Sequence, residues 1–235
     1  MKNIIILFIL LPILSLTEII QTTSIDINND NKPETIILEG TPISSIYWDD
    51  LFISLKTTEL IKKIKLGFGG YNPELFVLDF DGDKTLDIFI KADSGGSGNF
   101  NEYFIYSLTK GIILNNEELV NLSGFFMDGF KAIIKYKEFY TYIDLSDKKE
   151  FYIQNKIYNK YGQFIGKDKR LFIGGISNLK TIDFQNDKTY ELEGYISISG
   201  AFHADKIGFA HFIYSVKKKK VIWLEISKLI YIDGD

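Results

Sequence analysis

The chain has 235 residues, with 27 Lys or Arg against 31 Asp or Glu, so its formal net charge is −4. It contains no cysteine, which excludes a disulfide scaffold, a thiolate metal site and a catalytic thiol. The acidic balance argues against a general nucleic-acid binder, and a hydrophobic content of 46% excludes a disordered chain. The 14 tyrosines and 19 phenylalanines favour strands over helices.

An unbroken apolar run from Ile4 to Leu14 follows Lys2 near the start of the chain. It is too short for a membrane-spanning helix, which needs about 20 residues, and it matches the core of a secretory signal peptide. We expect residues 1–17 to be a signal peptide, with small residues for cleavage at Ser15–Thr17, and the protein to be secreted or held at the cell surface. An uncleaved anchor and a buried N-terminal strand are the alternatives. No later run is long enough for a transmembrane helix. Because no Pro- or Ser-rich linker follows the signal segment, we expect residues 18–235 to form one domain.

Short strand-like segments fill the rest of the chain, and turns rich in Gly, Asn, Asp and Lys separate them. One short helix is predicted over Asn116–Ser123, ending at Gly124, and the four lysines at Lys217–Lys220 read as a solvated hairpin turn. The predicted strands, in chain order, are Thr35–Leu38, Ile53–Leu55, Phe76–Leu78, Ile88–Ile90, Glu102–Leu108, Ala132–Tyr136, Phe139–Leu145, Glu150–Ile153, Leu192–Glu193, Tyr195–Ser199, Phe209–Val216 and Val221–Ile226.

Three nine-residue segments repeat one spacing of oxygen-bearing side chains, at positions 1, 3, 5 and 9. We call them loop 1 (residues 26–34), loop 2 (residues 79–87) and loop 3 (residues 183–191). Alternate residues of a tightly curled loop point inward, and a backbone carbonyl at position 7 completes the shell. The predicted ligands are Asp26, Asn28, Asp30, Lys32 and Glu34; Asp79, Asp81, Asp83, Thr85 and Asp87; and Asp183, Gln185, Asp187, Thr189 and Glu191.

Calcium is the ion that such a set of ligands suits, because Ca²⁺ takes six to eight oxygen ligands at about 2.3–2.6 Å. We expect two or three Ca²⁺ sites, with the third the weakest because Gln185 replaces a carboxylate there. Position 6, which favours glycine, is Asn31, Lys84 or Lys188, and these residues should strain the loops. The loops are not EF-hands, which need a Glu at position 12 and flanking helices. The plainer alternative is three polar turns, since Asp and Asn are ordinary turn residues.

The loops start at residues 26, 79 and 183, which indicates a repeat of roughly 52 residues with one degenerate copy at the turn Met127–Phe130. The loops and their following apolar strands resemble the FG-GAP/VCBS repeats of integrin-like β-propellers. The stretches Gly69–Tyr71, Leu78–Asp83, Ser94–Gly98 and Tyr142–Glu150 resemble uncharacterised secreted VCBS repeat proteins of Gram-positive bacteria. The resemblance implies an all-β, β-propeller-like fold of about four units, in an incomplete or irregular ring, with calcium in the loops and no defined reaction.

Other candidate sites have ordinary structural explanations. The glycine-rich segment 93–99 follows a strand but lacks a phosphate-binding fingerprint, and it reads as a hairpin loop. The only histidines, His203 and His211, have no neighbouring metal or catalytic motif, and no nucleophile elbow is present. The sequence therefore predicts a non-enzymatic binding or structural module with a protein or polysaccharide ligand. The alternative is a secreted polysaccharide hydrolase in which calcium is structural.

Overall fold

The computed structural model describes residues 16–57, 61–96, 98 and 100–230. The predicted signal peptide lies almost entirely outside this range. The all-β prediction is confirmed, because the regular structure of the described residues consists of fifteen strands, one short α-helix and one 3₁₀ turn at Ser146–Lys148. The elements are β1 (Glu18–Ile25), β2 (Glu34–Pro42), β3 (Tyr47–Lys56), β4 (Ile61–Lys65), β5 (Gly70–Leu78), β6 (Asp87–Gly95), β7 (Phe100–Ser107), β8 (Gly111–Asn115), β9 (Ser123–Met127), β10 (Lys131–Tyr136), β11 (Phe139–Asp144), α1 (Lys149–Gln154), β12 (Phe172–Ile182), β13 (Glu191–Ser199), β14 (Lys206–Ser215) and β15 (Lys220–Lys228).

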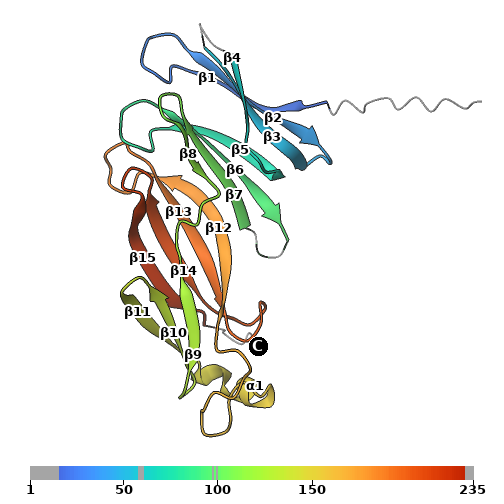
Figure 1. Cartoon of the computed structure of the whole chain (residues 1–235), viewed down its shortest axis with the longest axis vertical. Coiled ribbons are helices and arrows are strands. Elements are labelled where there is room, and N and C mark those ends of the chain that lie inside the picture. The colour runs from blue at the N-terminus through green and yellow to red at the C-terminus, as the bar shows by residue number, and fades with distance from the viewer. Residues whose placement is uncertain (1–15, 58–60, 97, 99, 231–235) are drawn as a thin grey trace, which may run out of the picture.

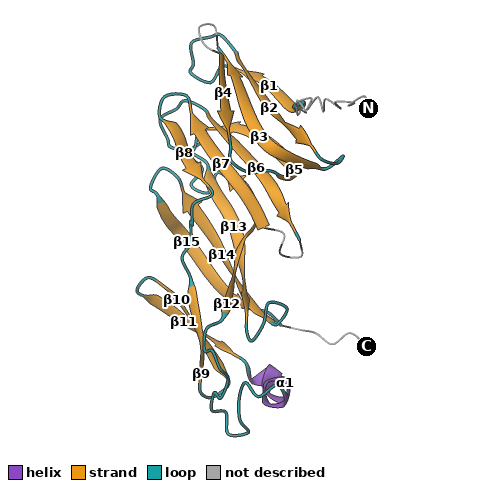
Figure 2. Ribbon diagram, turned by 45° about the vertical axis from the view of Figure 1, so that its right-hand side comes forward, coloured by secondary structure: helices purple, strands orange, loops and turns teal. Residues whose placement is uncertain are grey.

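Twelve of the strands form three antiparallel meanders of four consecutive strands each, β1–β4, β5–β8 and β12–β15 (Figure 1). We call them the first, middle and last meander. Only short pairings join them: Tyr47 with Tyr71 and Trp48 with Gly70 join β3 to β5, and Ser177 with Phe100 joins β7 to β12. The meanders follow one another along the long axis of the molecule, and the sheet of β9, β10 and β11 lies beside the last one (Figure 2).

The middle meander is buried on both faces. Successive side chains of a strand point to opposite faces, so Ile88 and Ile90 of β6 lie on one face and Phe89 lies on the other. Ile88 and Ile90 belong to a core cluster shared with the first meander, whereas Phe89 belongs to a cluster shared with the last meander and the three-stranded sheet. This burial on both faces explains why the sequences of β6 and β7 are almost continuously apolar.

The outer faces of the first and last meanders are more polar, and each carries a carboxylate paired with a lysine. Glu39 of β2 lies 2.9 Å from the Lys63 ammonium, and Glu193 of β13 lies 3.0 Å from the Lys180 ammonium. Both carboxylates alternate with core residues of their own strands and therefore face away from the core.

The β-propeller prediction is wrong. The described strands run from β1 at one edge to β15 at the other in an open series, with no closed ring or barrel. The turn at Met127–Phe130 exists, but it joins β9 to β10 in the separate three-stranded sheet rather than opening a fourth meander. A ring needs every unit to present two apolar faces, and the charged outer faces of the end meanders do not provide them.

The end of the molecule beyond the three-stranded sheet holds α1. The predicted strand at Glu150–Ile153 is wrong because these residues form α1, and the predicted helix over Asn116–Ser123 does not form. Tyr152 of α1 is fully buried, and its hydroxyl donates a hydrogen bond to Asp205 in the β13–β14 connection. Within the described part of the chain, no helix has the length and apolar character needed to cross a membrane.

Candidate functional site

Each acidic loop joins the first two strands of a meander, and the three loops share one backbone conformation. Positions 4 and 6 are left-handed in all of them, which explains why Gly or Asn stands at position 4. The lysines at position 6 adopt this unfavourable conformation as well, as the sequence predicted. The φ values are 61° and 65° at Asn29 and Asn31, 74° and 72° at Gly82 and Lys84, and 54° and 67° at Asn186 and Lys188.

The loops also share their internal hydrogen bonds. The backbone N–H of position 6 donates to the carboxylate of position 1, over 2.7 Å from Asn31 to Asp26, 2.9 Å from Lys84 to Asp79 and 3.1 Å from Lys188 to Asp183. The N–H of position 7 donates to the carboxylate of position 5, over 2.8 Å in loop 1 and 2.9 Å in loops 2 and 3. These bonds hold the side chains of positions 1 and 5 in fixed directions, so the repeated spacing specifies a repeated structure.

Position 9 closes each loop from the protein side. Glu34, Asp87 and Glu191 are almost fully buried, and each accepts a hydrogen bond from the backbone N–H of position 2, over 2.9, 3.0 and 3.1 Å respectively. A buried carboxylate is costly unless its oxygens are satisfied. Whether a loop can hold a cation therefore depends on whether the second carboxylate oxygen of position 9 already has a hydrogen-bond donor.

Loop 2 leaves that second oxygen without a partner. Asp87 Oδ1 is the one buried side-chain oxygen or nitrogen of the described residues for which no hydrogen-bond partner is found. One carboxylate oxygen each from Asp79, Asp81 and Asp87 lies within 4.8 Å of the others, and no other such group of acidic or histidine side chains occurs in the described chain. Convergent carboxylates around an unpartnered oxygen are the donor set that a hard divalent cation prefers.

The electrostatics of loop 2 reflect this crowding. Burial raises the pKa of Asp87 to about 6; the Phe80 N–H and the nearby Ser107 hydroxyl oppose that rise, whereas the charges of Asp81 and Asp79 add to it. Asp83 behaves in the opposite way. The hydroxyl of Thr85 and the Lys110 ammonium lower its pKa to about 2, against a smaller effect of burial.

Loops 1 and 3 each have an internal bond that loop 2 lacks. The side-chain amide at position 3 donates to a carboxylate of its own loop, from Asn28 to Asp30 over 3.3 Å and from Gln185 to Glu191 over 2.8 Å. The longer side chain of Glu191 lets it bond the Phe184 N–H and the amide together. The carboxylates of loops 1 and 3 do not converge as those of loop 2 do, and metal binding by these two loops stays a prediction.

The three loops also contact one another in a row, along the left-hand side of the view in Figure 1. The Leu86 N–H donates to the Ile27 carbonyl over 2.9 Å, and the Tyr190 N–H donates to the Asp79 carbonyl over 2.8 Å. The Asn29 amide donates to the Lys84 carbonyl over 2.9 Å. The sequence identified the loops but not this contact, nor Lys110, which lies on loop 2 from the distant β7–β8 turn.

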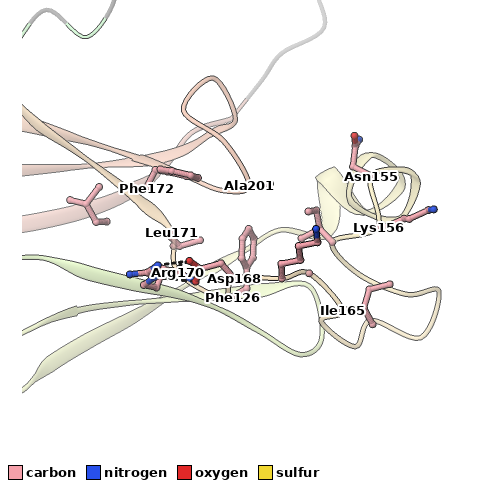
Figure 3. A pocket seen from close by; sticks show the side chains of 13 residues that line it. Phe126, Asn155, Lys156, Ile165, Asp168, Arg170, Leu171, Phe172 and Ala201 are labelled. Carbon is pink, nitrogen blue, oxygen red and sulfur yellow. Dashed lines mark hydrogen bonds and ion pairs between the residues drawn. The ribbon is translucent and has the colours of Figure 1, made fainter.

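A wide cleft lies elsewhere, between the segment that follows α1 and the end of the last meander (Figure 3). Its volume is about 870 Å³, and its lining combines apolar side chains such as Phe126 and Leu171 with Lys156 and Lys167. Its one lining carboxylate, Asp168, forms an ion pair with Arg170, which lowers the pKa of Asp168 to about 2. No predicted ligand lines this cleft.

The two histidines occupy structural positions. His211 stacks on Tyr195 with ring centroids 4.3 Å apart, and its Nε2 lies 2.6 Å from Glu193 Oε1 on the outer face of the last meander. His203 packs against the ring of Phe172 with centroids 4.5 Å apart. The glycine-rich segment at 93–99 connects β6 to β7 as the predicted hairpin, although residues 97 and 99 lie outside the described part of the chain.

Comparison with known proteins corrects the resemblance to FG-GAP/VCBS repeats, because no family of that kind matches the chain. The family model that matches is the YybI C-terminal domain, over residues 120–229. The uncharacterized protein YybI of Bacillus subtilis (strain 168) is 30% identical over 205 residues, which cover 81% of this chain and 77% of the relative. No solved structure matches the chain. The alignment with the Bacillus protein extends well beyond the C-terminal domain, so the chain belongs to the YybI family.

Proposed function

We propose that the chain is an exported, non-enzymatic binding module in which one Ca²⁺ ion in loop 2 stabilises the stack of meanders. The observation that supports the ion is the buried Asp87 Oδ1, which has no hydrogen-bond partner and lies beside the carboxylates of Asp79 and Asp81. A cation bound by these three side chains would satisfy that oxygen and offset the repulsion between the carboxylates. It would also fix the junction between β5 and β6 in the middle meander.

Calcium fits this loop better than magnesium. Mg²⁺ requires near-ideal octahedral geometry at about 2.0–2.1 Å and keeps several waters, whereas Ca²⁺ accepts irregular sets of oxygens at longer distances. The donors of loop 2 come from carboxylates held at several angles by backbone N–H groups, from Gly82 to Asp79 and from Phe80 to Asp87. Export supports the same choice, because an apolar run at residues 4–14 precedes the domain.

Binding rather than catalysis is supported by the cleft beside α1. Asp168 is the one carboxylate among its lining residues, and the pairing with Arg170 keeps this side chain ionised. A hydrolase acting on glycosidic bonds needs two carboxyl groups flanking the bond, one of them protonated. The apolar floor and the lysines of the cleft suit a bound protein or polysaccharide better than they suit that chemistry.

Thermal unfolding of the purified chain in EGTA, in millimolar Ca²⁺ and in millimolar Mg²⁺ tests the proposal. An ion that binds only the folded state adds about 2.7 kcal/mol at 100 times its Kd, which corresponds to a rise in Tm of roughly 5–10 °C for a domain of this size. We expect this rise with Ca²⁺ for the wild type and for Asp168→Asn, but not for Asp87→Asn. If neither ion changes the wild-type Tm, the three loops are polar turns and the calcium proposal is wrong.

A further inference from the structure

Lys110 lies against the acidic loop of the middle meander. It belongs to the turn between β7 and β8, and its ammonium is 2.6 Å from Asp81 Oδ2 and 2.9 Å from Asp83 Oδ2. Half of the Lys110 side chain is exposed, whereas Asp87 is fully buried. The ammonium therefore covers the solvent side of loop 2, and the unpartnered oxygen of Asp87 lies on the protein side.

The two oxygens that Lys110 contacts are the ones that the loop leaves free. Asp81 Oδ1 accepts the Asp83 N–H over 3.2 Å, and Asp83 Oδ1 accepts the Thr85 N–H over 2.9 Å. Among the described residues, Lys110 is the only group found to donate a hydrogen bond to the second oxygen of each of these two side chains. A Ca²⁺ ion about 2.3–2.6 Å from either of these oxygens would lie close to the ammonium and would be repelled by its charge.

We propose that Lys110 is a built-in competitor of the metal ion in loop 2, and that metal binding expels its ammonium and releases the β7–β8 turn. The inference rests on the proposed function, because it concerns the same site. Two cations held by the same carboxylates repel each other, so the binding of one weakens the binding of the other. An internal competitor lowers the apparent affinity, and it sets the site to respond to the high calcium concentrations found outside cells, where modules bind with Kd of about 10⁻⁴–10⁻³ M.

A second lysine provides a matched control. The side chain of Lys217 lies over Gly82 of the same loop, since a Cβ added to Gly82 would meet Lys217 Nζ at 2.6 Å. Lys217 thus places a positive charge near loop 2, but its position is over the backbone rather than on the carboxylates of Asp81 and Asp83. Removing it changes the local field without removing the proposed competitor.

Calorimetric titration of Ca²⁺ into the wild type, Lys110→Met and Lys217→Met tests this inference. We expect Lys110→Met to bind Ca²⁺ roughly threefold or more tightly than the wild type, because two ion pairs no longer oppose the metal. Lys217→Met should change the affinity less. In the wild type, the NMR signal of the Lys110 side-chain CH₂ next to the ammonium should shift on addition of Ca²⁺, while far-ultraviolet circular dichroism verifies that each variant is folded.

The outcomes separate the two proposals. Equal affinities for the wild type and Lys110→Met, or an equal gain in Lys217→Met, would overturn the competition and leave the calcium site standing. If Lys110→Met binds Ca²⁺ and neither of the other two proteins does, the competition is supported, and Lys110 excludes the ion from the wild type. Binding by none of the three proteins would overturn the calcium site itself.

Discussion

The hydroxyl of Tyr152 donates a 2.8 Å hydrogen bond to Asp205 Oδ2, and this bond joins α1 to the β13–β14 connection. The other oxygen of Asp205 lies 2.6 Å from the Lys148 ammonium, and the Ala201 N–H also donates to the carboxylate. The Asp205 side chain is almost fully buried. This carboxylate therefore fastens the α1 end of the molecule to the last meander.

Replacing Asp205 should destabilise the chain strongly. We expect Asp205→Ala to lower the free energy of unfolding by about 3 kcal/mol, since it removes the carboxylate that pairs with Lys148 and accepts from the buried Tyr152 hydroxyl. Tyr152→Phe should cost about 1 kcal/mol, the value of one hydrogen bond. Urea denaturation measures both, and Asp168→Asn serves as an exposed control. Equal stability of Asp205→Ala and the wild type would contradict a fastening role.

Neighbouring residues of β6 should both be sensitive to truncation, because the middle meander is buried on both faces. We expect Phe89→Ala and Ile90→Ala each to cost about 3 kcal/mol or more, since each leaves a cavity in a different core cluster. In β2, Leu38 faces the core and Ile37 faces outward. Leu38→Ala should therefore lower the free energy of unfolding by as much, and Ile37→Ala should lower it clearly less. Chemical denaturation of the four variants checks this pattern, and a tolerant Phe89→Ala would argue against the packing of the last meander on the middle one.

Loop 3 should gain a metal site from one substitution. Gln185→Asp adds a fourth carboxylate to those of Asp183, Asp187 and Glu191, and it removes the amide that now bonds Glu191. We expect calorimetry to report one more Ca²⁺ per chain than in the wild type. Gln185→Ala is the control, because it removes the same amide without adding a ligand. A gain of binding in both variants would mean that releasing Glu191 is sufficient.

Glu193 should make stability depend on pH in the acidic range. Burial alone would raise the pKa of Glu193, but hydrogen bonds and charge from Lys180 and His211 outweigh it and hold the pKa below its ordinary value of 4.5. A carboxyl with a lowered folded-state pKa contributes stability above its unfolded pKa and loses it as the pH falls through the folded value.

The wild type should therefore lose more stability than Glu193→Gln when the pH falls from 5 toward 3. Thermal unfolding at a series of pH values compares the two proteins. Lys63→Met, which removes an ion pair on the opposite end meander, controls for the general effect of surface charge. Parallel curves for the wild type and Glu193→Gln would show that the carboxyl contributes no pH-dependent stability.

The sequence identified the features that are local. The nine-residue spacing defined three loops whose left-handed residues and internal hydrogen bonds depend only on neighbours in the chain, and period-two alternation marked most strands. Ring closure is not local, because it depends on whether the outer faces of β2 and β13 are apolar, and Glu39 and Glu193 make them polar. The region around α1 was mistaken for a strand because its aromatic and apolar residues are consecutive, and only Tyr152 among them is buried, against the distant Asp205. Lys110 was missed because its turn reaches loop 2 through the pairing of β6 with β7, which sets Ser107 opposite Asp87.

The two outer Glu–Lys pairs also limit how far this architecture extends itself. Each meander buries an apolar face against the next, so an end meander with a second apolar face would recruit another unit, from the same chain or from another molecule. Glu39 with Lys63 and Glu193 with Lys180 stand where that recruitment would begin. We therefore expect the two pairs to end the stack of meanders, and a chain that lost both charged pairs to associate more readily through its outer faces.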